Sequence, residues 1–261
     1  MKRREILEKI YKNEITVEEA EDLLSKNNIE VVDEFLRFDI FREQRTSIPE
    51  IVYAETKSPE NVAEIVKKIA LKKEILLVSR TTEKHVKKLK EIEDSLKDFN
   101  FEYGPEERFC LVKKKGYKVK KENGKVGIIT AGTSDIPVAT EAKVVAEMMG
   151  CETILINDVG VAGLHRLFEP LNSILKEKVD VLIVAAGMEG ALPTVIAGLV
   201  DIPVIGLPIS TGYGFGGKGQ TALMSMLQTC ALGLAVVNID AGVSAGAFAA
   251  KIAKRASRKK T

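Results

Sequence analysis

The sequence predicts an α/β protein: a parallel sheet with helices on both faces, preceded by a smaller module of helices and a short α/β segment. From about residue 125, apolar segments of strand length alternate with segments of helix length, which is typical of a parallel sheet. These strands are apolar throughout, as strands buried on both faces are. The Asn123-Gly124 turn marks a change from lysine-rich to apolar composition. We therefore predict domains at 1–123 and 124–256, with a basic tail at 257–261.

The amino-terminal module is expected to begin with two short helices between residues 4 and 25, where apolar residues recur at helical spacing. Thr16 and Glu19 have the spacing of a capping box for the second helix. Strands and helices then alternate as strand 51–54, helix 58–71, strand 74–78 and helix 82–96. Residues 101–121 contain Gly104-Pro105 and a dense lysine run, and no element is assigned there.

The second half is expected to contain five strands, each followed by a helix. The strands are predicted at 126–130, 153–157, 181–185, 204–207 and 235–239. The helices are predicted at 137–149, 164–175, 192–199, 221–230 and 244–256.

Composition excludes several classes of partner and site. Lys and Arg number 39 against 37 Asp and Glu, so the net charge of +2 does not point to a nucleic acid or an anionic membrane. No apolar run reaches the roughly 18 residues of a membrane span, and the charged start of the chain is unlike a secretory signal, so we expect a cytoplasmic protein. Cys110, Cys151 and Cys230 form no CxxC pair and have no neighbouring histidines, which disfavours a disulfide framework and a zinc site.

The segment after the first strand of the second half, residues 131–137, is a candidate phosphate site because it leads directly into a helix. Gly132 permits close approach of a ligand, and Thr133 and Ser134 supply hydroxyl groups. Ser134 and Asp135 could equally serve only as helix caps.

Two more loops, 186–193 and 210–220, follow later strands, so three loops should converge at the carboxyl edge of the sheet. The candidate ligand contacts in these two loops are Gly187, Met188, Gly190, Ser210, Thr211 and Gly212. The second loop is not a Walker A motif, because Gly219 stands where the magnesium-binding Ser or Thr belongs. Its glycine spacing also fails the dinucleotide fingerprint.

Three further side chains could carry chemistry. Glu189 lies between small residues at the expected crevice, where partial burial would suit a general base, although it could equally be a solvent-facing glutamate. Cys230 closes a predicted helix before a buried strand, which favours a small buried hydrophobe over a reactive thiol. Arg166 lies near a helix start and is a candidate partner for an anion.

Three motifs resemble the PurE-type carboxylase domain that acts on aminoimidazole ribonucleotides. They are Thr130-Ala-Gly-Thr-Ser-Asp-Ile-Pro137, Ala185-Ala-Gly-Met-Glu-Gly-Ala-Leu-Pro193 and Asp201-Ile-Pro-Val-Ile-Gly-Leu-Pro208. The resemblance implies a flavodoxin-like sheet. The histidines of those enzymes are missing, because Ala191 and Val161-Ala162 occupy their positions, which argues against purine biosynthesis.

A finer resemblance is to the LarB family. It rests on Asp158-Val-Gly-Val-Ala-Gly-Leu-His-Arg-Leu167, Gly187-Met-Glu-Gly190, Ser210-Thr-Gly-Tyr-Gly214, Ser225-Met-Leu-x-x-Cys230 and Val237-Asn-Ile-Asp240. The amino-terminal half agrees through Asp39-x-x-Arg42-x-x-Arg45-x-Ser47-x-Pro49-Glu50 and Lys57-Ser-Pro-Glu60. Ser47 replaces the glycine usual in that family.

The LarB resemblance implies an enzyme of nickel-pincer cofactor biosynthesis. Such an enzyme carboxylates the pyridinium ring of nicotinic acid adenine dinucleotide, with CO2 or bicarbonate as co-substrate. It also hydrolyses the phosphoanhydride, giving pyridinium-3,5-biscarboxylic acid mononucleotide and AMP. Cys230 is similar to the family's covalent nucleophile and Glu189 to its base.

The same reading suggests the remaining site components. Arg42, Arg45 and Lys57 could reach the adenylate or the pyrophosphate, or could serve only to dock the module. Asp135 or Asp240 could hold Mg²⁺ or a similar divalent cation. The resemblance also implies a homo-oligomer, a PurE-like octamer.

Two rival functions remain open from the sequence. One is a carboxylase or mutase acting on an imidazole ribonucleotide, which would not depend on Cys230. The other is a non-catalytic, nucleotide-sensing regulatory protein that binds a ligand without turnover.

Overall fold

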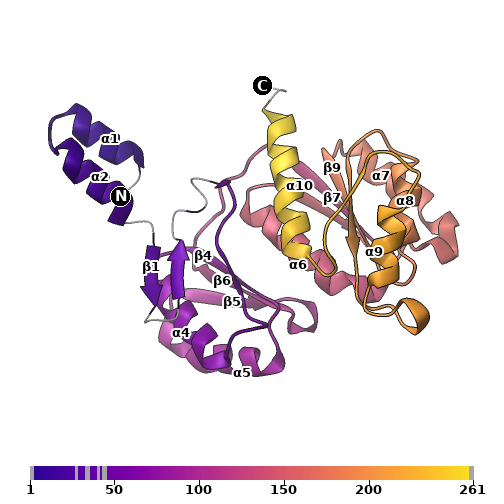
Figure 1. Ribbon diagram of the computed structural model, residues 1–261, viewed down its shortest axis with the longest axis horizontal. Coiled ribbons are helices and arrows are strands. Elements are labelled where there is room, and N and C mark those ends of the chain that lie inside the picture. The colour runs from indigo at the N-terminus through magenta and orange to yellow at the C-terminus, as the bar shows by residue number, and fades with distance from the viewer. Residues whose placement is uncertain (1–2, 27–28, 33–35, 40–41, 43–45, 259–261) are drawn as a thin grey trace.

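The computed structural model describes residues 3–26, 29–32, 36–39, 42 and 46–258, and arranges two sheets and their helices in layers (Figure 1). The chain opens with α1 (Arg3–Tyr11), α2 (Val17–Lys26) and a hairpin of β1 (Ile29–Val32) with β2 (Leu36–Asp39). The predicted capping box of α2 is confirmed. The Thr16 N–H donates to Glu19 Oε2 at 2.9 Å, and the Glu19 N–H donates to Thr16 Oγ1 at 3.1 Å.

The amino-terminal module is built on a four-stranded sheet of order β3-β4-β6-β5. Its elements are β3 (Ile51–Tyr53), α4 (Pro59–Ala70), β4 (Ile75–Ser79), α5 (Glu83–Ile92), β5 (Phe99–Tyr103) and β6 (Phe109–Lys114). Helix α4 starts at a proline, and the Ser58 side chain caps it by accepting from the Asn61 N–H at 3.2 Å. Only the β3–β4 pair is parallel.

The second half forms a five-stranded, wholly parallel sheet of order β11-β10-β9-β7-β8. Its elements are β7 (Lys125–Thr130), α6 (Ile136–Met148), β8 (Glu152–Ile156), α7 (Phe168–Lys176), β9 (Val181–Ala186), α8 (Ala191–Ala197), β10 (Val204–Pro208), α9 (Gln220–Leu227), β11 (Leu234–Val236) and α10 (Gly242–Ser257). In chain order this is the 2-1-3-4-5 arrangement of flavodoxin-like folds, so the predicted fold class is confirmed. The strand order reverses between β7 and β9, where such folds bind ligands.

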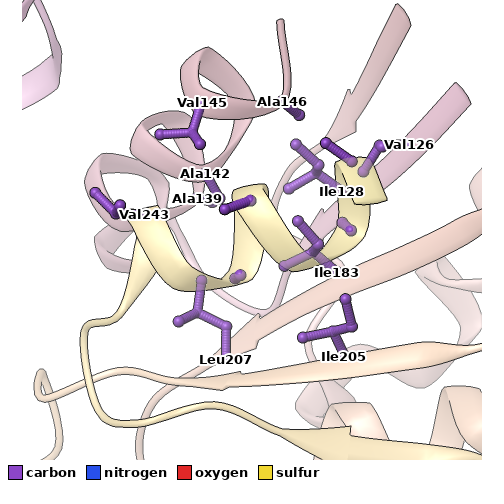
Figure 2. Packing of buried hydrophobic residues seen from close by; sticks show 14 of the residues in the cluster. Val126, Ile128, Ala139, Ala142, Val145, Ala146, Ile183, Ile205, Leu207 and Val243 are labelled. Atoms are coloured by element: carbon purple, nitrogen blue, oxygen red, sulfur yellow. The ribbon is translucent and has the colours of Figure 1, made fainter. Parts of the chain in front are cut away.

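Alternate residues of the parallel strands pack on opposite faces of the sheet. Ile128 and Ile183 face α6 and α10, where they share a core with Ala142, Val145 and other residues of these helices (Figure 2). Leu182 faces the opposite layer of α7, α8 and α9. The sheet is therefore buried on both sides, which explains the absence of polar alternation in its strands.

Helix α6 lies between the two sheets (Figure 1). Val138 and Ala142 share a buried cluster with Leu77, Phe109 and Leu111 of the amino-terminal sheet, and the same cluster continues into the parallel sheet. No residue of α6 is fully exposed. Within the described part of the chain, no helix is long and apolar enough to cross a membrane.

Some elements differ from the sequence prediction. Strands β5 and β6 lie where no element was assigned, because the alternation of Phe99, Phe101 and Tyr103 is short and the apolar run of β6 leads directly into lysines. The hairpin of β1 and β2 was also missed. Helix α9 ends at Leu227, three residues earlier than predicted, so Cys230 lies in the loop before β11.

Candidate functional site at the carboxyl edge of the parallel sheet

Asp135 lies at the centre of the converging loops. Its Oδ2 accepts the Gly132 N–H at 2.7 Å, and the backbone N–H groups of Gly187 and Ala131 lie close enough to its carboxylate to favour the charged form. Burial raises the pKa of Asp135 to about 6, against the opposing effect of these donors, and the nearby charge of Asp240 adds to the rise. The expected convergence of the first and second loops is thereby confirmed.

The first loop forms a short 3₁₀ turn, Thr133–Asp135, with Gly132 as its cap. Thr133 and Ser134 are exposed, so their hydroxyls are accessible to a ligand at the sheet edge. The Asp135 carboxylate caps this turn by accepting the Gly132 N–H, so the capping interpretation holds for Asp135. Phosphate binding by this segment stays a prediction.

The second loop, after β9, is held in an unusual conformation. Met188 has φ +48° and Gly190 has φ +65°. A Cβ atom on Gly190 would lie 2.7 Å from the Cα of Ala222, so this loop abuts the first turn of α9. Glu189 is exposed, and the expectation of partial burial is therefore wrong for a single chain, because the small residues around it leave its side chain uncovered.

The third loop, after β10, completes the edge. The Ser210 N–H donates to Asp240 Oδ1 at 3.0 Å, which ties this loop to the end of the segment that follows β11. A Cβ atom on Gly187 would lie 2.5 Å from Thr211 Oγ1, and one on Gly212 would lie 3.5 Å from the backbone of Met188. The second and third loops are thus in direct contact, as predicted.

Arg166 lies on the same edge, beyond β8. It forms an ion pair with Asp158, with Nη1 and Oδ2 2.9 Å apart, and both side chains are about half exposed. Asp158 is itself anchored, because its N–H donates to the Thr130 hydroxyl at 3.1 Å. Arg166 could therefore bind an anion only if it shared its guanidinium with Asp158 or gave up this ion pair.

The two predicted metal ligands, Asp135 and Asp240, lie close enough for the charge of one to raise the pKa of the other. Within the described ranges, no group of three or more His, Cys, Asp or Glu residues could hold a metal ion. Mg²⁺, however, is commonly held by one or two carboxylates together with substrate phosphates. Asp135 is largely occupied by backbone N–H groups, so Asp240 fits this role better.

The predicted contributions of the amino-terminal module are only partly placed. Arg42 forms a two-pronged contact with Glu50, with Nη1 3.2 Å from both carboxylate oxygens. Lys57 donates to the carbonyl of Tyr53 at 2.7 Å and so stabilises its own module. Arg45 lies outside the described residues.

Cys230 is exposed, whereas Cys110 and Cys151 are buried. Burial raises the thiol pKa of Cys110 to about 12 and that of Cys151 to about 11, which makes both poor nucleophiles. The interpretation of Cys230 as a buried hydrophobe is therefore wrong. Of the three thiols, it is the one accessible to a substrate.

Cys230 does not lie with the three loops of its own chain. Helix α9 begins at the carboxyl edge and returns to the amino edge, where Gly233 accepts from the Val204 N–H at 3.1 Å. From Ala222, beside Gly190, helix α9 runs five residues to Leu227, or about 7.5 Å at a helical rise, and Cys230 lies three residues beyond its end. Strand β10 spans the same two edges and covers about 13 Å from Val204 to Pro208.

Sequence reasoning missed a group of residues where the two modules meet. Tyr53, Arg80 and Glu141 line a cavity of about 220 Å³ together with residues 238–241 and Ser244. The available signal was Glu141, a glutamate on the otherwise apolar face of α6. Such a residue is rarely buried without a charged partner.

Comparisons with known proteins agree with this architecture. Residues 125–260 match the model of the AIR carboxylase family, and residues 29–114 match that of the LarB/PurE-like N-terminal domain. An uncharacterized protein of Methanocaldococcus jannaschii is 46% identical over 253 residues, which cover 96% of each chain. The N5-carboxyaminoimidazole ribonucleotide mutase of the same organism is 35% identical over 127 residues, 48% of this chain and 76% of that protein. A crystal structure of Treponema denticola PurE aligns with a TM-score of 0.36 and 19% identity, covering 52% of this chain and 93% of that one.

Proposed function

The chain belongs to the LarB/PurE-like family, with an AIR carboxylase domain behind a LarB-type amino-terminal domain, and from this premise we propose that it is a pyridinium carboxylase and hydrolase. Its substrate would be nicotinic acid adenine dinucleotide, and its products pyridinium-3,5-biscarboxylic acid mononucleotide and AMP. The observation that carries the proposal is the exposure of Cys230 in a chain whose other two thiols are buried.

The chemistry needs a nucleophile because a pyridinium ring is too electron-poor to attack CO2. Addition of the Cys230 thiolate at ring carbon C4 gives a dihydropyridine, in which C5 is nucleophilic and forms the new carbon–carbon bond. A base then removes the C5 proton, and departure of the thiolate restores the aromatic ring. Glu189, exposed at the carboxyl edge, is the candidate base.

Hydrolysis of the phosphoanhydride would take place at the three loops. Thr133 and Ser134 offer exposed hydroxyl groups there, Thr211 lies on the neighbouring loop, and Arg166 can meet a phosphate. A divalent cation held by Asp240, with Asp135 beside it, would neutralise charge on the two phosphates. Water then cleaves the bond between them and AMP leaves.

The proposed reaction requires a homo-oligomer. The Cys230 sulfur and the Glu189 carboxylate must act on adjacent ring carbons, which needs them within roughly 5–6 Å of each other. Within one chain they lie at opposite edges of the sheet. Large apolar side chains are exposed at both edges: Leu232, at 91%, near Cys230, and Tyr213 and Phe215 in the third loop. A second copy that joins the two edges would cover these side chains and complete the site.

The test is product analysis after incubating wild type and Cys230→Ser with nicotinic acid adenine dinucleotide, Mg²⁺ and bicarbonate. We expect AMP and the doubly carboxylated mononucleotide from wild type, and neither from the variant. Intact-protein mass spectrometry should detect an adduct on wild type only. Absence of both product and adduct with a correctly folded oligomer would refute the proposal.

A second candidate function is carboxyl transfer on an imidazole ribonucleotide, supported by the likeness of the second half to N5-carboxyaminoimidazole ribonucleotide mutases. That reaction needs no thiol at position 230. Turnover of such a ribonucleotide by both wild type and Cys230→Ser would favour it. Ligand binding without turnover of either substrate would indicate a sensing role.

A further inference from the structure

Two guanidinium groups of the amino-terminal module converge on one peptide carbonyl of the carboxyl-terminal domain. Arg80 Nη2 and Arg108 Nη2 each lie 3.1 Å from the main-chain oxygen of Asp240. Arg80 comes from the end of β4 and Arg108 from the turn before β6, so the two arginines reach this oxygen from neighbouring strands. A carbonyl that accepts two charged donors is held more firmly than one with a single neutral partner.

The peptide that they hold is part of the candidate site. Asp240 has φ +52°, a left-handed conformation that costs free energy for a residue with a side chain and persists only where its surroundings fix it. Its N–H donates to the Pro208 carbonyl at 2.9 Å, and its Oδ1 accepts the Ser210 N–H at 3.0 Å. The orientation of Asp240 therefore sets the start of the third loop.

Glu141 provides the counter-charge beneath the two arginines. It is 1% exposed, accepts from the Ser79 hydroxyl at 2.7 Å and faces Arg108 Nε at 3.7 Å. Neither its Oε2 nor Arg108 Nε makes a hydrogen bond. The pair attracts by charge while leaving the Nη2 groups aimed at Asp240. A carboxylate from α6 thus faces the Arg108 guanidinium, and Glu55 pairs with the Arg80 guanidinium at 2.8 Å.

We propose that Arg80 and Arg108 are positioning residues of the site, which hold Asp240 so that it fixes the third loop at Ser210. The amino-terminal module then contributes to the site by holding the main-chain carbonyl of Asp240. Lysine cannot replace these arginines, because its single ammonium cannot contact Asp240 while also meeting Glu55 or Glu141. The substrate readout below rests on the proposed function, whereas the exchange readout does not.

The experiment compares Arg80→Lys and Arg108→Lys with Ser79→Ala. Ser79 is buried in the same junction and bonds Glu141, but it does not touch Asp240, so its variant reports on docking of the module alone. Asp240→Ala removes the acceptor of the Ser210 N–H and serves as the reference for complete loss of that bond. Each protein is measured as the full chain by hydrogen-exchange mass spectrometry, thermal unfolding and steady-state kinetics.

Both lysine variants should speed amide exchange in the segment containing Ser210 by about fivefold or more, towards the rate in Asp240→Ala. They should also raise KM for the dinucleotide by about fivefold with kcat within a factor of two. Ser79→Ala should lower Tm and change neither quantity. Unchanged exchange at Ser210 in both lysine variants, or equal acceleration in Ser79→Ala, would overturn the proposal. If wild type does not turn over the dinucleotide, the proposed function fails, and the exchange comparison still decides the role of the arginines.

Discussion

The proposed site, shared between two chains, makes a quantitative prediction for mixed oligomers. Cys230→Ala and Glu189→Gln should each be inactive, because the first lacks the nucleophile and the second lacks the base. In one chain Cys230 and Glu189 lie at opposite edges of the sheet, which strand β10 spans over about 13 Å, more than twice the roughly 5–6 Å that the reaction allows. If each site takes Cys230 from one copy and Glu189 from another, a mixed oligomer contains some sites with both residues intact.

The size of the recovered activity follows from chance. When equal amounts of the two variants are dissociated and reassembled, the chain that supplies the base is intact in half of the sites, and so is the chain that supplies the thiol. About one quarter of wild-type activity should therefore return. The assay is formation of the doubly carboxylated mononucleotide, with subunit exchange verified by native mass spectrometry of differently tagged chains.

Two controls give the upper and lower limits of the recovered activity. Wild type taken through the same dissociation gives the activity that reassembly itself recovers. Mixing Cys230→Ala with the double variant of Cys230→Ala and Glu189→Gln should recover nothing, because no intact thiol is present. No activity from verified mixed oligomers of the two single variants would refute the shared site and would require Cys230 and Glu189 to meet within one chain.

Further measurements test the structure more directly. The pKa of Asp135 is raised to about 6 in the folded state, compared with about 4 in the unfolded state. The folded protein therefore binds this proton more tightly, which stabilises it at pH values below about 4. This stabilisation is lost as the pH rises through 6. In Asp135→Asn, measured by denaturant unfolding without divalent cations, the loss of unfolding free energy between pH 4 and 7 should be smaller than in wild type by roughly 3 kcal/mol. Gly246→Ala should lower stability by about 1–3 kcal/mol, since its Cβ would lie 2.2 Å from the Ala142 carbonyl, whereas Gly198→Ala, with no atom nearer than 3.5 Å, should leave Tm almost unchanged. Iodoacetamide should modify only Cys230 in the native protein, and all three cysteines after denaturation. Labelling of Cys230 should be slower when the dinucleotide is bound. Labelling of a second cysteine in the native protein would contradict the described burial.

The fold was largely predictable because its signals are local. The apolar strands of the second half are separated by helix-length segments, and chain order with short connections leaves little choice of topology. The capping box at Thr16 and the proline start of α4 likewise depend on a few neighbouring residues. Strand β5 was missed because its period-two pattern is only five residues long, and β6 because its apolar run Phe109–Val112 leads directly into lysines.

The site was predictable only where it depends on strand ends. Loops that follow parallel strands must share one edge, so the meeting of Asp135 with Gly187 and Thr211 could be expected. The position of Cys230 could not be predicted in this way, because its proposed role rests on a resemblance. A resemblance does not say whether the residue acts in the site of its own chain or of another. At the junction, Glu141 on an apolar helix face could have indicated a charged partner, but the sequence does not identify the partners, which lie 33 to 62 residues away.

Helix α6 sets a limit on how this chain can be divided. A carboxylase domain without an amino-terminal module needs a polar surface where α6 is covered here by the amino-terminal sheet. In this chain that surface is formed by Val138 and Ala142 around the buried Glu141. Cutting the chain near Asn123 would expose the apolar surface of α6 and leave the Glu141 carboxylate without its arginine partner. The isolated second half should therefore precipitate or bind chaperones. Because α6 packs against both sheets, each module depends on the other to cover its apolar surface.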